Sequence, residues 1–231
     1  MNTKILAYHS IGNEGSGEVG SELYCVSVDN FRAQVEYISV YGVRCTVYGW
    51  DVKLTFDDGL LNNYTHAYPI LREFGLKAYF FILAGKVGKN GYMNWQQIKE
   101  LQSAGMIIGS HGITHRILTG LKSKDLNYEL KESKKILEET LACNIDSLSI
   151  PRGFCNKKII AKAREIGYKT IFTSDNRIAV KADWTLEKFV SVLNNGYSLG
   201  DKAVELAKNA SKRVLGAKTY DKLRTGVLGQ R

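Results

Sequence analysis

The sequence predicts an α/β fold built from parallel βα units. Roughly seven short apolar runs, rich in β-branched and aromatic residues, alternate with amphipathic segments of about ten to eighteen residues. Hydrophobic residues make up 44% of the 231 residues, enough for a full core in one domain. These observations favour either a βα barrel or a doubly wound sheet.

The expected elements follow from periodicity and from cap residues. Strands are expected at residues 4–8, 43–48, 52–56, 76–83, 106–109, 147–150, 168–173 and 178–180. Helices are expected from residue 29 onward, with Ser27 or Asp29 as the cap, and at 64–74, 95–104, 123–141, 157–166, 186–193, 201–215 and 218–225. The 123–141 helix places Leu126, Leu130, Ile136 and Leu137 inside and a lysine- and glutamate-rich face outside.

Two adjacent carboxylates, Asp57 and Asp58, end the apolar run 52–56 and precede Gly59. A turn with solvated acids is one interpretation, because Asp and Gly favour turns. Some fifty residues later, His111 and His115 follow another apolar run, and on a helical turn this spacing puts both imidazoles on one side. Two histidines and one carboxylate form a common catalytic zinc set, which leaves the second carboxylate free to act as a base.

The placement of these polar residues is informative in itself. His9, the Asp57-Asp58 pair, His111 and the Pro151-Arg152 pair all come immediately after predicted strands. In a βα barrel such positions lie on one face, where active sites form. A purely structural origin would scatter polar residues over both faces.

Two motifs together carry a family resemblance. Thr-Phe-Asp-Asp-Gly at 55–59, followed by Ser-His-Gly-Ile-Thr-His at 110–115, resembles the first two motifs of the polysaccharide deacetylase family, which is carbohydrate esterase family four or the NodB-homology domain. Tyr-His-Ser-Ile at 8–11 and Ser-Ile-Pro-Arg-Gly at 149–153 are also similar, so the resemblance covers roughly residues 4–195. It implies an irregular (β/α)7 barrel.

The resemblance also implies a reaction, the hydrolysis of an N-acetyl group on an amino sugar. It makes Asp57 the catalytic base and Asp58, His111 and His115 the metal ligands. Zinc suits these ligands, and cobalt or another first-row ion fits the same set. The backbone N–H of Arg152 would stabilise the oxyanion.

The chain departs from the family pattern at several positions. Ser149 stands where members have an arginine paired with the base, and Arg152 is a candidate to substitute for it. The late Leu-x-His motif, which supplies the general acid, has no counterpart, because no histidine follows His115.

His9 is the best candidate to donate that proton or to contact the substrate, with a buried structural imidazole as the alternative. His66 is expected on the surface. Asp175 stands where members have the Asp that orients the missing histidine, and Trp184 is out of place for the usual aromatic motif.

Two other functions stay open beside an N-deacetylase of a glycan or glycolipid precursor. One is a hydrolase of the same fold that acts on another small amide or imide. The other is a catalytically inactive carbohydrate-binding or scaffolding protein, which the missing acid and arginine would favour.

Charge and cysteine content bear on compartment and partners. The net charge is +9, and residues 201–231 hold eight basic and three acidic residues, so we expect a catalytic domain at 1–200 and a basic helical extension at 201–231. That extension could contact an anionic membrane, whereas no nucleic-acid motif accompanies it. The four cysteines are widely spaced, which favours free thiols. We expect a cytoplasmic protein with peripheral contact at the inner face of the membrane.

Overall fold

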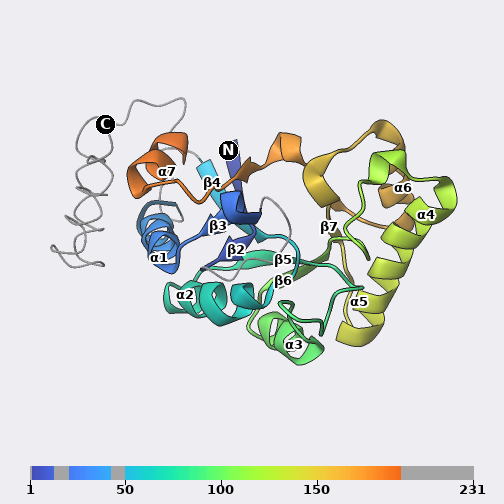
Figure 1. Ribbon diagram of the computed structural model, residues 1–231, viewed down its shortest axis with the longest axis horizontal. Coiled ribbons are helices and arrows are strands. Elements are labelled where there is room, and N and C mark those ends of the chain that lie inside the picture. The colour runs from blue at the N-terminus through green and yellow to red at the C-terminus, as the bar shows by residue number, and fades with distance from the viewer. Residues whose placement is uncertain (1, 13–20, 43–49, 194–231) are drawn as a thin grey trace.

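The computed structural model describes residues 2–12, 21–42 and 50–193 (Figure 1). The expected strand at 43–48, the expected helices at 201–215 and 218–225 and the basic segment 201–231 lie outside these residues and stay predictions. No helix within the described residues is both long and apolar enough to cross a membrane.

Seven parallel strands form one sheet, in the order β8-β7-β6-β5-β4-β1-β9. Their bounds are β1 (Asn2–Tyr8), β4 (Trp50–Phe56), β5 (Ala78–Ile82), β6 (Ile107–Ser110), β7 (Ser147–Ser149), β8 (Thr170–Phe172) and β9 (Ile178–Ala179). From β1 to β8 the order advances in one direction, as in a barrel, without the reversal that marks a doubly wound sheet. A separate pair, β2 (Ser10–Ile11) and β3 (Cys25–Val26), was not expected.

Aromatic contacts show that the sheet is curled. Phe81 on β5 and Phe172 on β8 have ring centroids 5.1 Å apart, although β6 and β7 lie between their strands. In a flat sheet three strand spacings would separate them by about 14 Å. The sheet is therefore an open (β/α)7 barrel, as predicted, with β8 and β9 as its edges among the described residues.

Helices cover the outer face of the sheet, with α1 and α7 together at one end and α4, α5 and α6 at the other (Figure 1). Their bounds are α1 (Val28–Tyr37), α2 (Tyr68–Glu73), α3 (Trp95–Ser103), α4 (Ser123–Asn127), α5 (Ser133–Leu141), α6 (Lys157–Ile166) and α7 (Leu186–Leu193). Shorter helical turns are η1 (Ser21–Tyr24), η2 (Ile38–Gly42), η3 (Asn63–Ala67), η4 (Leu118–Gly120), η5 (Tyr128–Glu132), η6 (Pro151–Gly153) and η7 (Ser174–Asn176).

Several expected caps are confirmed. Asn94 and Gln97 form a capping box at the start of α3, and the Asn156 side chain accepts from the Ile159 N–H at the start of α6. Each such cap satisfies N–H groups that have no partner inside the helix. These caps fix where each helix begins, and so fix the length of the loop that leaves the preceding strand.

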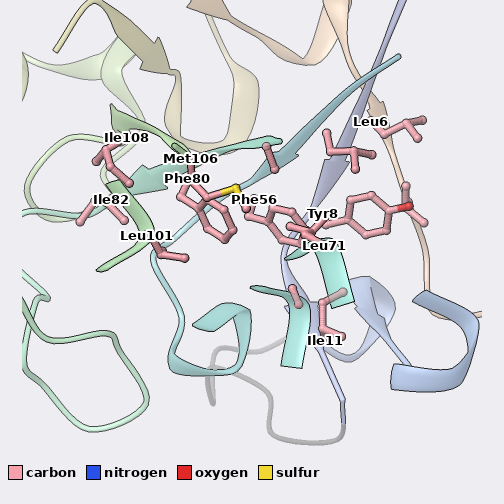
Figure 2. Packing of buried hydrophobic residues seen from close by; sticks show 14 of the residues in the cluster. Leu6, Tyr8, Ile11, Phe56, Leu71, Phe80, Ile82, Leu101, Met106 and Ile108 are labelled. Carbon is pink, nitrogen blue, oxygen red and sulfur yellow. The ribbon is translucent and has the colours of Figure 1, made fainter. Parts of the chain in front are cut away.

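The main core lies between the sheet and helices α1, α2 and α3. Phe56 stacks on Phe80 at 4.9 Å and on Tyr8 at 5.4 Å, and all three are fully buried (Figure 2). These residues alternate along their strands with residues that face the barrel interior. The packing holds the ends of β1, β4 and β5 rigidly, and polar loops leave from those ends.

Candidate active site

Three predicted metal ligands come together at the carboxyl ends of β4 and β6. Asp58 follows β4, while His111 and His115 follow β6, and one ligand atom from each lies within 4.8 Å of the others. The Oδ1 atom of Asp58 is 3.4 Å from Nε2 of His111 and 3.3 Å from Nε2 of His115. Two atoms about 2.1 Å from one tetrahedral ion stand about 3.4 Å apart, so these spacings fit a shared zinc-like ion.

The surroundings of the cluster also fit a cation. Oδ1 of Asp58 is buried and has no hydrogen-bond partner among the described residues. Nδ1 of His111 lies 2.8 Å from the carbonyl oxygen of Ser149, which can only accept, so Nδ1 carries the proton. The lone pair of Nε2 is then available to bind an ion. Metal-bound histidines usually donate a hydrogen bond from the other ring nitrogen in this way.

The two histidines do not lie on a helical turn, as the spacing suggested, but on an irregular loop after β6. Gly112 has φ 83° and His115 has φ 66°, so two residues of this loop adopt the left-handed conformation. Asp58 is also left-handed, with φ 74°. A non-glycine residue in this region costs energy, and such residues persist where the surrounding structure determines them strongly.

Asp57 is buried directly beside the cluster and both of its oxygens have donors. Nη1 of Arg177 lies 2.8 Å from Oδ1, and the Ser149 hydroxyl donates to Oδ2 at 3.1 Å. Burial alone would raise the pKa of Asp57, but Arg177 and the histidines His111 and His9 outweigh it and hold the pKa well below its ordinary value. The carboxylate is therefore ionised and oriented.

Arg177 forms an ion pair with the base, a role for which Arg152 was the candidate in the sequence. Arg152 is exposed on the neighbouring loop after β7, with φ 57°. Arg177 lies 120 residues from Asp57 and comes from the loop after β8. It stands directly before β9 and not immediately after a strand, so the rule that selected His9 did not select Arg177.

His9 lies at the same edge of the sheet, after β1. Its ring packs on Tyr24 at 5.0 Å, and its backbone oxygen accepts from the Asn63 side chain at 2.6 Å. Its Nδ1 atom is buried without a hydrogen bond among the described residues. His66, expected on the surface, is half-buried.

Comparison with known proteins gives a family match. The model of the polysaccharide deacetylase family matches residues 49–171. YxkH of Bacillus subtilis is 33% identical over 124 residues, which cover 54% of this chain and 44% of YxkH. The peptidoglycan-N-acetylglucosamine deacetylase of Bacillus cereus is 28% identical over 145 residues, covering 62% of this chain and 65% of the relative. The chain spans about half to two thirds of the length of these relatives.

Solved structures share the fold. The Streptococcus pyogenes deacetylase PplD in complex with acetate superposes with a TM-score of 0.72 at 25% identity, over 83% of this chain and 97% of PplD. A polysaccharide deacetylase from Bacillus cereus gives a TM-score of 0.72 at 23% identity, over 83% of this chain and 68% of the other; at that identity the likeness concerns the fold alone.

Proposed function

The chain belongs to the polysaccharide deacetylase family, and on that premise we propose that it is a metal-dependent hydrolase that removes N-acetyl groups from an amino-sugar glycan or glycolipid precursor. The observation that carries the proposal is the convergence of Asp58, His111 and His115 beside a buried, ionised Asp57. The same geometry would serve hydrolysis of another small amide. The likeness to the peptidoglycan-N-acetylglucosamine deacetylase of Bacillus cereus favours the acetylated glycan.

Asp58, His111 and His115 would hold the ion, most simply zinc, with cobalt or another first-row metal as alternatives. When bound, a divalent ion supplies Lewis acidity, which lowers the pKa of water and polarises an acetyl carbonyl. Ser149 fixes the His111 ring through its carbonyl and Asp57 through its hydroxyl. One short strand thus aligns a ligand with the base.

The remaining residues move protons and bind charge. Asp57 accepts a proton from the attacking water as the water oxygen bonds to the acetyl carbon, and the backbone N–H of Arg152 donates to the carbonyl oxygen as it becomes negative. His9 donates a proton to the amide nitrogen as the carbon-nitrogen bond breaks. The products are acetate and the free amine of the sugar.

The roles of Asp57 and Asp58 can be tested with variants, because loss of the base should abolish turnover but not metal binding, whereas loss of a ligand should abolish metal binding. We expect Asp57→Asn to keep the metal and to lose roughly 10² to 10⁴ in rate, because a base acts in proton transfer. Asp58→Ala, His111→Ala and His115→Ala should lose the metal itself. Metal analysis and acetate release from acetylated amino-sugar oligomers measure both effects.

The outcomes also separate the rival functions. Wild-type release of acetate by metal-loaded Asp57→Asn would contradict the base assignment. A metal-loaded wild type that binds the oligomers without releasing acetate would identify an inactive carbohydrate-binding protein. Turnover of cyclic amides in place of the oligomers would identify the other hydrolase.

A further inference from the structure

We propose that Glu129 is a positioning residue of the metal site, whose buried carboxylate fixes the peptide segment between His111 and His115. The inference rests on the proposed function, because it concerns the same metal site. The hydrogen bonds of Glu129 run to the segment between the two histidines, so it acts through the backbone that carries them.

Glu129 makes three hydrogen bonds to this segment. Its Oε2 atom accepts from the N–H groups of Ile113 at 2.7 Å and Thr114 at 3.0 Å, and its Oε1 atom accepts from the Thr114 hydroxyl. Only 1% of Glu129 is exposed. A buried carboxylate is costly unless hydrogen-bonded, so the loop and the carboxylate stabilise each other.

The loop needs such a partner because of its backbone. Gly112 and His115 both have positive φ, a backbone conformation that is strained for a non-glycine residue such as His115. A Cβ placed on Gly112 would lie 3.0 Å from Oε2 of Glu129. The carboxylate therefore packs directly against the turn that sends the chain from His111 back to His115.

The helix that carries Glu129 is attached at both ends of this loop. Ser133, one turn later, shares a 2.8 Å hydrogen bond with Ser110, the residue immediately before His111. Glu129 contacts Thr114, the residue immediately before His115. The segment η5, which has a π-helical turn, and the first residue of α5 thus set the position of each histidine through the residue that precedes it. Such π turns often occur at functional sites.

Two variants separate the length of the Glu129 side chain from its charge. Glu129→Asp keeps the charge and withdraws the oxygens by one methylene, whereas Glu129→Gln keeps an oxygen within reach of both N–H groups. We expect Glu129→Asp to bind zinc about 10- to 100-fold more weakly and Glu129→Gln to stay within about threefold of wild type, since supporting contacts of this kind are worth that much affinity. Glu139→Asp, at an exposed position of α5, is the matched control.

Zinc affinity would be measured by competition with a chromophoric chelator, and the visible spectrum of the Co²⁺ form would report ligand geometry. We expect an altered Co²⁺ spectrum for Glu129→Asp alone. If Glu129→Asp does not fold, Thr114→Val, which removes the hydroxyl donor, should weaken zinc binding severalfold.

Two results would decide against the inference, and a third would decide against the proposed function. Folded Glu129→Asp with wild-type zinc affinity and Co²⁺ spectrum would overturn it, even if its melting temperature were lower. Unfolded Glu129→Asp together with wild-type affinity in Thr114→Val would overturn it as well. A wild-type chain that binds neither zinc nor cobalt would instead overturn the proposed metal-dependent function.

Discussion

Asp57 keeps its charge in a buried position because Arg177 and Ser149 occupy its two oxygens. Removing one member of a buried ion pair leaves the other without compensation, which is worse than having neither. The guanidinium also holds the carboxylate in one orientation. Arg177 should therefore affect both stability and catalysis.

We expect Arg177→Met to lower the free energy of unfolding by about 3–5 kcal/mol, the usual cost of breaking such a pair. Because Arg177 lowers the pKa of Asp57, its loss raises that pKa, and a base works only above its pKa. The acid limb of the kcat/KM profile should move to higher pH. Arg164→Met, at an exposed position of α6, is the control; an unmoved acid limb in Arg177→Met would remove Arg177 from the site.

His9 carries the prediction about the general acid. We expect His9→Gln to keep the metal and the fold but to lose roughly 10² or more in rate, because the leaving amine then lacks a proton donor. The basic limb of the pH profile should change with it. Acetate release within about twofold of wild type, with the same pH profile, would leave the acid to another group.

Residues whose position depends on local sequence were predictable, and those that depend on sheet closure were not. The strand-end rule placed Asp57, Asp58, His111 and His9 correctly, because parallel strands share one carboxyl edge. The Arg177 contact spans 120 residues and depends on β9 joining the sheet beside β1, the neighbour of β4. No local pattern distinguishes Arg177 from the exposed Arg152.

At the scale of elements, the helix at 123–141 shows what periodicity gives and what it omits. Its bounds and its buried leucines Leu126, Leu130 and Leu137 are confirmed. Its glutamates, however, do not all face solvent. Glu129 stands three residues after Leu126 and four before Ser133, on the inner stripe, and spacing alone would have placed it inside. A glutamate is usually expected to face solvent. Glu129 is buried because its carboxylate accepts hydrogen bonds from the loop after β6.

Two neighbouring loops at the site meet at Gly153. Its φ is 74°, and a Cβ placed there would lie 2.6 Å from the Ser174 Cβ and 2.9 Å from the Ser174 backbone nitrogen. We expect Gly153→Ala to destabilise the protein by about 1–3 kcal/mol, because the loops after β7 and β8 must separate. Those loops carry Arg152 and Arg177, so activity should fall as well.

Chemical denaturation and acetate release measure the two effects of Gly153→Ala. Gly88→Ala is a suitable control, since it has a similar φ of 77° but open space around the Cβ position. Equal losses in both variants would mean that backbone strain, not the contact between the loops, is responsible.

At the scale of the whole molecule, the metal site connects parts of the barrel that lie far apart in sequence. Asp58 follows β4, and both histidines follow β6, so the complete ligand set exists only in the folded chain. An ion that binds the folded state alone stabilises it by RT ln(1 + [L]/Kd), which is about 2.7 kcal/mol at one hundred times Kd. The stability of the fold and the occupancy of the site are therefore linked.

For a domain of this size, that stabilisation corresponds to an increase in Tm of about 5–10 °C. We expect zinc to raise the Tm of the wild type by this amount and a chelator to reverse it. His115→Ala should lose the shift, because two ligands remain, whereas Asp57→Asn should keep it, because Asp57 acts as a base. Differential scanning calorimetry at several zinc concentrations measures the effect. An equal Tm shift in His115→Ala would mean that the stabilising ion binds elsewhere on the molecule. The stability of the barrel would then not depend on ion binding at the candidate active site.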